Sequence, residues 1–140
     1  MRILESATPS DWVEQVLEQP GLLLLDHLQC EMKAATVAQS LVTKNPHLDV
    51  LVRPLIDLAH EELAHYRLIH ELVTRRGVRP EPITPSPYMQ ELRHRAGRGR
   101  HEPLLDRLIV AALVEARSCE RFHLLASESD RKSTRLNSSH

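Results

Sequence analysis

The sequence predicts an all-α fold, and its composition is the first reason. Aromatic residues make up only 3% of the 140 residues, and there are only four glycines. β-Sheet proteins are typically rich in β-branched and aromatic residues and need glycine in their turns. Here Leu, Ala, Glu and Arg dominate instead, and the length suits one domain. A β-sandwich or barrel is therefore excluded.

Two short helices are predicted from local signals. The first begins at Thr8–Asp11, where a capping Thr, a first-turn Pro and an acid follow one another, and it ends before Pro20. The second spans residues 88–95 and ends at the glycines that follow. A proline-rich stretch over residues 78–87 precedes it and predicts an extended connection.

Three long helices complete the prediction, over about residues 22–43, 46–76 and 103–127. Asn45–Pro46 separates the first two, and Gly77 is the expected C-terminal stop of the second. Pro54 lies inside the second helix, where we expect a kink.

The last eleven residues differ in pattern from the rest. Residues 130–140, DRKSTRLNSSH, resemble the translation of a sequencing-adapter read-through. Without their three basic residues and Asp130, the formal net charge changes from −1 to −3. We therefore expect an incomplete helical domain over residues 1–129 and a non-native tail over residues 130–140.

The remaining composition indicates a cytoplasmic protein. Two cysteines, Cys30 and Cys119, are too few for a disulfide framework and fit a reducing compartment. The aliphatic run at 22–25 is far too short to span a membrane, and no signal-peptide pattern precedes it. A net charge near zero gives no global field that attracts nucleic acid.

Each long helix places a carboxylate at the centre of its apolar stripe. At 100° per residue, the three residues are Glu31, Glu62 and Glu115, and His65 lies one turn after Glu62. The neighbours within about 60° are Leu24, Leu28, Ala35, Ala38 and Val42 in the first helix, Leu51, Leu55, Leu58, Ala59, Ile69 and Val73 in the second, and Leu104, Leu108, Ala111, Cys119, Phe122 and Ala126 in the third.

Three carboxylates in one small core predict a bound cation. An ionised group buried without partners costs several kcal/mol, and mutual repulsion raises the pKa of each acid. Oxygen ligands with one imidazole suit iron or manganese better than structural zinc. Di-iron carboxylate bundles use one Glu from each of two helices and Glu-x-x-His from each of two others. Glu31 and Glu115 match the single carboxylates, and Glu62–His65 matches one Glu-x-x-His; the second is absent.

Two further motifs have simpler interpretations. Glu120–His123 also reads Glu-x-x-His, but Glu120 lies about 140° from Glu115, which favours a solvated face with an internal ion pair. For His27, one turn before Glu31, two interpretations stay open: an outer-shell partner of the ligand, or a histidine satisfied at the edge of the core.

Three segments resemble the tRNA hydroxylase family called MiaE. They are DHLQCEMKAA (26–35), HEELAHYRLIHELVTRRG (60–77) and LLDRLIVAALVEARSCERF (104–122), and the resemblance covers roughly residues 3–126. It implies a ferritin-like four-helix bundle, truncated here to three long helices plus short ones. It also implies that Glu31, Glu62, His65 and Glu115 are ligands of two non-haem iron ions.

The resemblance further implies a reaction. The family hydroxylates the isopentenyl group of 2-methylthio-N6-isopentenyladenosine next to the tRNA anticodon, with O2 as co-substrate and an external electron donor or electron-transfer partner. Leu28, Leu58, Cys119 and Phe122 would wall a dry pocket around the metal. Because the second Glu-x-x-His is missing, we expect the chain as given to be inactive.

A basic cluster is the candidate tRNA-binding surface. Four arginines, Arg93, Arg95, Arg98 and Arg100, lie beside two glycines. Such local density suits phosphate binding, although an exposed charged loop is the simpler interpretation without the tRNA resemblance.

Two other functions stay open. One is a ferritin-like iron oxidase or storage protein without an RNA substrate, which would not need the basic cluster. The other is a metal-free helical interaction module, which iron analysis would identify. For the chain as given, the apolar stripes that a fourth helix would cover predict poor solubility or self-association.

Overall fold

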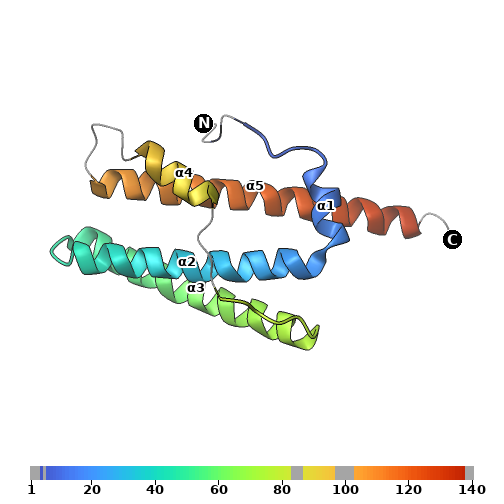
Figure 1. Cartoon of the computed structure of the whole chain (residues 1–140), viewed down its shortest axis with the longest axis horizontal. Coiled ribbons are helices and arrows are strands. Elements are labelled where there is room, and N and C mark those ends of the chain that lie inside the picture. The colour runs from blue at the N-terminus through green and yellow to red at the C-terminus, as the bar shows by residue number, and fades with distance from the viewer. Residues whose placement is uncertain (1–3, 5, 83–86, 97–102, 138–140) are drawn as a thin grey trace. The chain divides into compact units, whose positions relative to one another are not determined.

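The computed structural model confirms the all-α prediction. It describes residues 4, 6–82, 87–96 and 103–137, which form five α-helices and no strand (Figure 1). The helices are α1 (Trp12–Glu18), α2 (Pro20–Lys44), α3 (Asp49–Arg75), α4 (Pro87–Ala96) and α5 (Pro103–Asn137). None of the described helices is both long and apolar enough to cross a membrane.

The chain divides into two compact units. One consists of Gln19–Pro85 and holds α2 and α3; the other consists of Met1–Glu18 with Ser86–His140 and holds α1, α4 and α5. Each unit has its own internal contacts, so each is described by itself.

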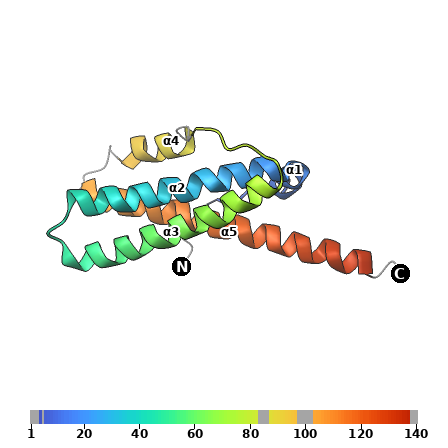
Figure 2. The same cartoon turned by 90° about the horizontal axis from the view of Figure 1, so that it is seen from below.

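In the first unit, α2 and α3 form an antiparallel hairpin, and they lie side by side in both views (Figures 1 and 2). Their buried positions are three or four residues apart, except for one gap of ten residues on α3, as expected for two helices that share one apolar seam. These positions are Leu28, Glu31, Ala35, Ala38 and Leu41 on α2 and Leu55, Ala59, Ile69 and Val73 on α3. Three of the nine are alanines, and small residues let two helix axes approach closely.

The end of α3 is fixed by Gly77, as predicted. Its φ is +67°, in the left-handed region that favours glycine. The Gly77 N–H donates to the Thr74 carbonyl at 3.0 Å and the Val78 N–H donates to the Val73 carbonyl at 3.1 Å, the two bonds of a Schellman motif. The motif turns Val78 back onto a core cluster of Leu28, Ile69 and Val73.

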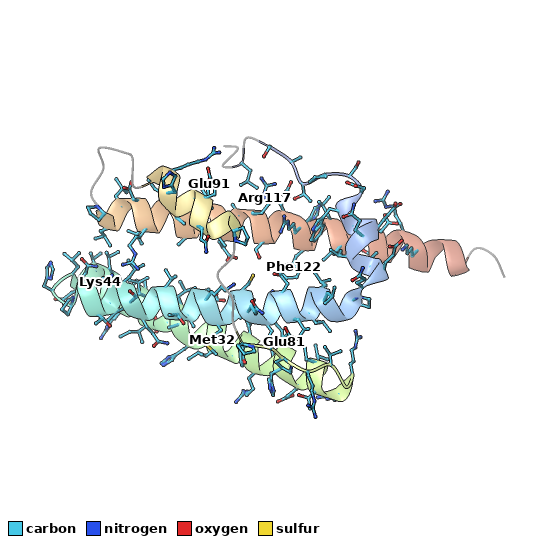
Figure 3. The ribbon with its side chains drawn as sticks, in the orientation of Figure 1. Met32, Lys44, Glu81, Glu91, Arg117 and Phe122 are labelled. Carbon is cyan, nitrogen blue, oxygen red and sulfur yellow. The ribbon has the colours of Figure 1, made fainter. Side chains whose placement is uncertain are left out.

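In the second unit, the N-terminal segment is attached to α5. Glu120 accepts a hydrogen bond from the Thr8 N–H at 2.9 Å and another from the Thr8 hydroxyl at 2.8 Å. Arg117, labelled in Figure 3, donates to the same carboxylate at 2.6 Å. One turn along, the Arg121 guanidinium lies 5.0 Å from the centre of the Trp12 ring. These contacts hold Thr8 and Trp12 against α5.

Two predicted boundaries were wrong. Thr8 does not cap α1, which begins at Trp12, because its N–H and hydroxyl are bonded to Glu120. The last helix does not stop near Ser127 but continues to Asn137, since no Pro or Gly interrupts this stretch. The helix α3 runs through Pro54 as one element.

Candidate metal site

Three predicted ligands meet on the seam between α2 and α3. One ligand atom each from Glu31, Glu62 and His65 lies within 4.8 Å of the other two. Glu31 comes from α2, whereas Glu62 and His65 share one face of α3 because residues three apart lie on the same side of a helix. The helix register that buries the apolar seam therefore also gathers these side chains.

Glu31 is the buried member of the cluster. Its side chain is 10% exposed, and its Oε1 lies 3.1 Å from Nε2 of His27. Its Oε2 is 3.4 Å from Nδ1 of His65, an ion-pair distance without hydrogen-bond geometry. With both carboxylates ionised, Oε2 has no hydrogen-bond partner among the described residues. A buried carboxylate oxygen without a donor is costly, and a cation bound there would remove that cost.

Glu62 is electrostatically strained in the absence of a cation. Burial, above all, raises its pKa from the ordinary 4.5 to about 7, and a proton on Glu62 would be shared with Glu31 through a hydrogen bond. The negative charge of Glu31 raises the pKa further, while His65 lowers it. The pair thus has the properties of two carboxylates that compete for one proton or share one cation.

The donor set suits the predicted metal. Two carboxylates and one imidazole, with no thiolate in the cluster, are the hard and borderline ligands that iron and manganese prefer. One single carboxylate, Glu31, beside one Glu-x-x-His motif, Glu62–His65, is also half of the ligand set of a di-iron bundle. The geometry therefore fits a bound metal ion.

Glu115, the fourth predicted ligand, lies in the other compact unit. It is on α5 and exposed. The apolar stripe around it has a mixed outcome: Phe122 is 44% exposed and Cys119 is exposed, whereas Leu104, Leu108 and Ala111 are half-buried, and the fully buried residue of α5 is Val110. The reason is that α1 and the N-terminal segment contact the opposite side of α5, at Arg117 and Glu120. A role for Glu115 as a ligand stays a prediction.

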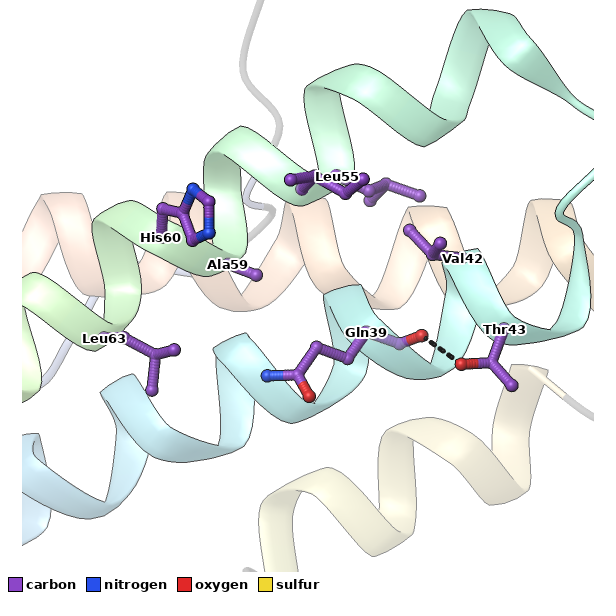
Figure 4. Close-up of a pocket in the computed structure, with 8 residues that line it drawn as sticks. Gln39, Val42, Thr43, Leu55, Ala59, His60 and Leu63 are labelled. Atoms are coloured by element: carbon purple, nitrogen blue, oxygen red, sulfur yellow. Dashed lines mark hydrogen bonds between the residues drawn. The ribbon is translucent and has the colours of Figure 1, made fainter.

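Two of the residues expected to wall a dry pocket lie on the hairpin. Leu28 is buried, but Leu58 is 40% exposed. The structure instead has a pocket of about 360 Å³ elsewhere along the seam (Figure 4). Its α3 residues Ile56, His60 and Leu63 lie on the flank away from His65, so it is not part of the ligand cluster.

Glu120, the first residue of the Glu120–His123 motif, contacts the N-terminal segment. Glu120 is engaged by Thr8 and Arg117, which confirms the internal ion pair and corrects the expectation of a solvated face. Its pKa is lowered, first by the Thr8 N–H and then by the Thr8 hydroxyl. This contact could not be predicted from a local pattern, because residues 8 and 120 are far apart in the chain.

The basic cluster is described only in part. Arg95 is exposed and donates to Glu91 at 2.6 Å within α4. Arg93 belongs to α4, and its side chain lies outside the described part of the chain, as do the whole of Arg98 and Arg100. A tRNA-binding role for these arginines stays a prediction.

Comparison with known proteins identifies the family. The family described as tRNA-(ms2io6A)-hydroxylase (MiaE) matches residues 1–138. A tRNA 2-(methylsulfanyl)-N6-isopentenyladenosine(37) hydroxylase of Pseudomonas putida KT2440 is 45% identical over 126 residues, which are 88% of this chain and 60% of that protein. The hydroxylase of the same name from Salmonella typhimurium LT2 is 32% identical, over 90% of this chain and 65% of its own length.

A solved structure agrees with the sequence relatives. It is a Synechococcus protein with aldehyde deformylating oxygenase activity, 39% identical, with a TM-score of 0.80 over 90% of this chain and 63% of that one. The chain spans 60–65% of the length of these three proteins. The predicted ferritin-like helical fold is confirmed, and the chain belongs to the MiaE family.

Proposed function

We propose that this chain is the metal-binding part of a non-haem di-iron monooxygenase that modifies tRNA. The substrate would be 2-methylthio-N6-isopentenyladenosine at the anticodon loop, and the product would carry a hydroxyl group on the isopentenyl side chain. The relatives named as hydroxylases of this nucleoside support the proposal. The observation that carries it is the Glu31–Glu62–His65 cluster, with its unsatisfied buried carboxylate oxygen.

Two iron ions would be held by Glu31, Glu62, His65 and Glu115, together with a second Glu-x-x-His that has no match in this chain. When bound, the ions would supply the chemistry that activates O2, with electrons from an external donor. The chain's own residues have simpler tasks. Glu31 and Glu62 supply the negative charge that retains the cation, and His65 supplies a nitrogen ligand from the same helix face as Glu62. The apolar seam, which includes Leu28 one turn before Glu31 and Ala59 one turn before Glu62, limits the access of water from the helix interface.

The tRNA would be bound by positive charge. We propose the arginines at positions 93, 95, 98 and 100 for this contact, since phosphate contacts dominate the affinity of proteins for nucleic acids. The proposed substrate also implies a cytoplasmic location. Because only Glu62–His65 places a Glu-x-x-His on the apolar stripe of a long helix, and the ligand set needs two, we expect the chain as given to bind metal but not to complete the reaction.

Iron analysis tests this proposal and separates it from the alternatives. The chain, purified and incubated with Fe2+ without oxygen, should retain one or two ions, and Glu62→Ala should retain fewer. Many ions per chain would indicate storage, and none in the wild type would indicate a metal-free helical module. Either result contradicts the proposal.

A second experiment tests the substrate. The chain should bind an anticodon stem-loop that carries the modified adenosine more tightly at low salt than at high salt. A version extended by the remaining region of its relatives should yield hydroxylated nucleoside in tRNA digests with iron, O2 and a reductant. The same version with Glu62→Ala should yield none, and unchanged product would refute the assignment.

A further inference from the structure

We propose that His27 is a positioning residue of the metal site, and this inference rests on the proposed function. Its imidazole Nε2 holds Oε1 of Glu31, so that Oε2 of the same carboxylate is the oxygen presented to His65. His27 is outside the group of three side chains whose ligand atoms converge. It therefore acts on the metal through Glu31.

The placement of His27 follows from the helix. His27 and Glu31 are four residues apart on α2, and such residues face each other one turn apart. The His27 side chain is 22% exposed and the Glu31 side chain 10%, so the contact at 3.1 Å is largely shielded from water. A polar contact to a carboxylate in such a place is stronger than one at the surface.

The two oxygens of Glu31 have different surroundings. A free carboxylate has two equivalent oxygens, and rotation about its last bond exchanges them. Here Oε1 lies 3.1 Å from Nε2 of His27, whereas Oε2 is buried without a hydrogen bond in the described part of the chain and lies 3.4 Å from Nδ1 of His65. The His27 contact therefore selects one orientation of the carboxylate.

This selection matters for metal binding. A ligand oxygen that already faces the site does not have to be ordered when the ion arrives, and hydrogen bonds to ligating carboxylates typically contribute 10- to 100-fold to metal affinity. The contact requires only an N–H donor at Nε2, which a neutral imidazole provides. It does not require a charge on His27.

Co2+ binding to the whole chain tests the proposal, with the dissociation constant and the visible absorption spectrum as readouts. His27→Leu and His27→Asn, which place no donor at the Nε2 position, should weaken Co2+ binding about 10- to 100-fold. His27→Gln, whose amide N–H reaches that position, should keep most of the affinity and the wild-type spectrum. His47→Leu, an exposed histidine in the turn between α2 and α3, is the matched control and should have no effect.

The outcomes separate the possible roles. Equal losses in all three His27 variants, with a spectrum that has lost a nitrogen ligand, would make His27 a metal ligand and overturn the proposal. Unchanged affinity in His27→Leu and His27→Asn, with lower stability towards urea, would leave a structural role only and also overturn it. If the wild type binds no Co2+ or Fe2+, the proposed function fails first; wild-type binding with unaffected variants refutes the positioning role alone.

Discussion

The Glu62→Gln substitution should stabilise the metal-free protein at pH 8. Burial and the charge of Glu31 disfavour the ionised form of Glu62, so its pKa in the folded protein is about 7 instead of 4.5. Gln has nearly the same shape and carries no charge, so it removes this penalty. The same substitution deletes a ligand atom and should weaken metal binding.

The sign of the effect follows from linkage. A carboxyl group with a raised folded-state pKa contributes its full stability below pH 4.5 and loses it as the pH rises towards about 7. A rise from 4.5 to about 7 corresponds to roughly 3 kcal/mol if none of it is screened. Because Glu62 is only partly buried, we expect about 1 to 2 kcal/mol at pH 8 and no difference at pH 4.

Urea denaturation followed by circular dichroism, in the presence of EDTA, measures this difference. Glu61→Gln is the matched control, because Glu61 is exposed and is the smallest contributor to the raised pKa. Saturating Co2+ should reverse the order at pH 8, since an ion at 100 times its dissociation constant adds about 2.7 kcal/mol to the protein that binds it. A Glu62→Gln protein that is less stable than the wild type at pH 8 in EDTA would refute the reasoning.

Three further predictions concern the same chain. Gly77→Ala should lower the free energy of unfolding by about 1 kcal/mol, because φ at this position is +67°. Gly21→Ala should not lower it, because the new Cβ would meet Val78 at an ordinary contact distance of 3.5 Å. Urea denaturation compares the two variants. The pKa of Glu120 is lowered, so its hold on Thr8 should be present above pH 4.5 and lost as the pH falls through the lowered value. Glu120→Gln should therefore reduce amide-exchange protection of Thr8 at pH 7 and have little effect near pH 2, and equal protection in both proteins at pH 7 would contradict this. Fe2+ without oxygen should raise the melting temperature, and EDTA should reverse the rise; an unchanged melting temperature in calorimetry would count against the metal site.

The hairpin and its ligands were predictable from the sequence because their signals are local. Periodic apolar residues define α2 and α3, and Gly77 defines the end of α3. Once two helices share one seam, carboxylates at the centre of each stripe must meet, and Glu31 and Glu62 do. The spacing of three residues adds His65 without further information.

The rest of the site depends on contacts between distant parts of the chain. The buried side of α5 was predicted from periodicity alone, and only its first half, at Leu104, Leu108 and Ala111, is half-buried in the structure. Thr8 and Glu120 form hydrogen bonds with each other on the side of α5 that the sequence pattern predicted to face solvent. The contact of His27 with Glu31 was left open in the sequence, because spacing shows proximity but not which atom of an imidazole donates.

The closing turn of α3 has a consequence for assembly. One helix hairpin brings together Glu31, Glu62 and His65. The end of its second helix, α3, is closed by the backbone hydrogen bonds of Gly77 and Val78. Hairpins with such local contacts form early, before pairings between distant segments. A nascent chain would thus have the three proposed metal ligands in place before the ribosome has made α5.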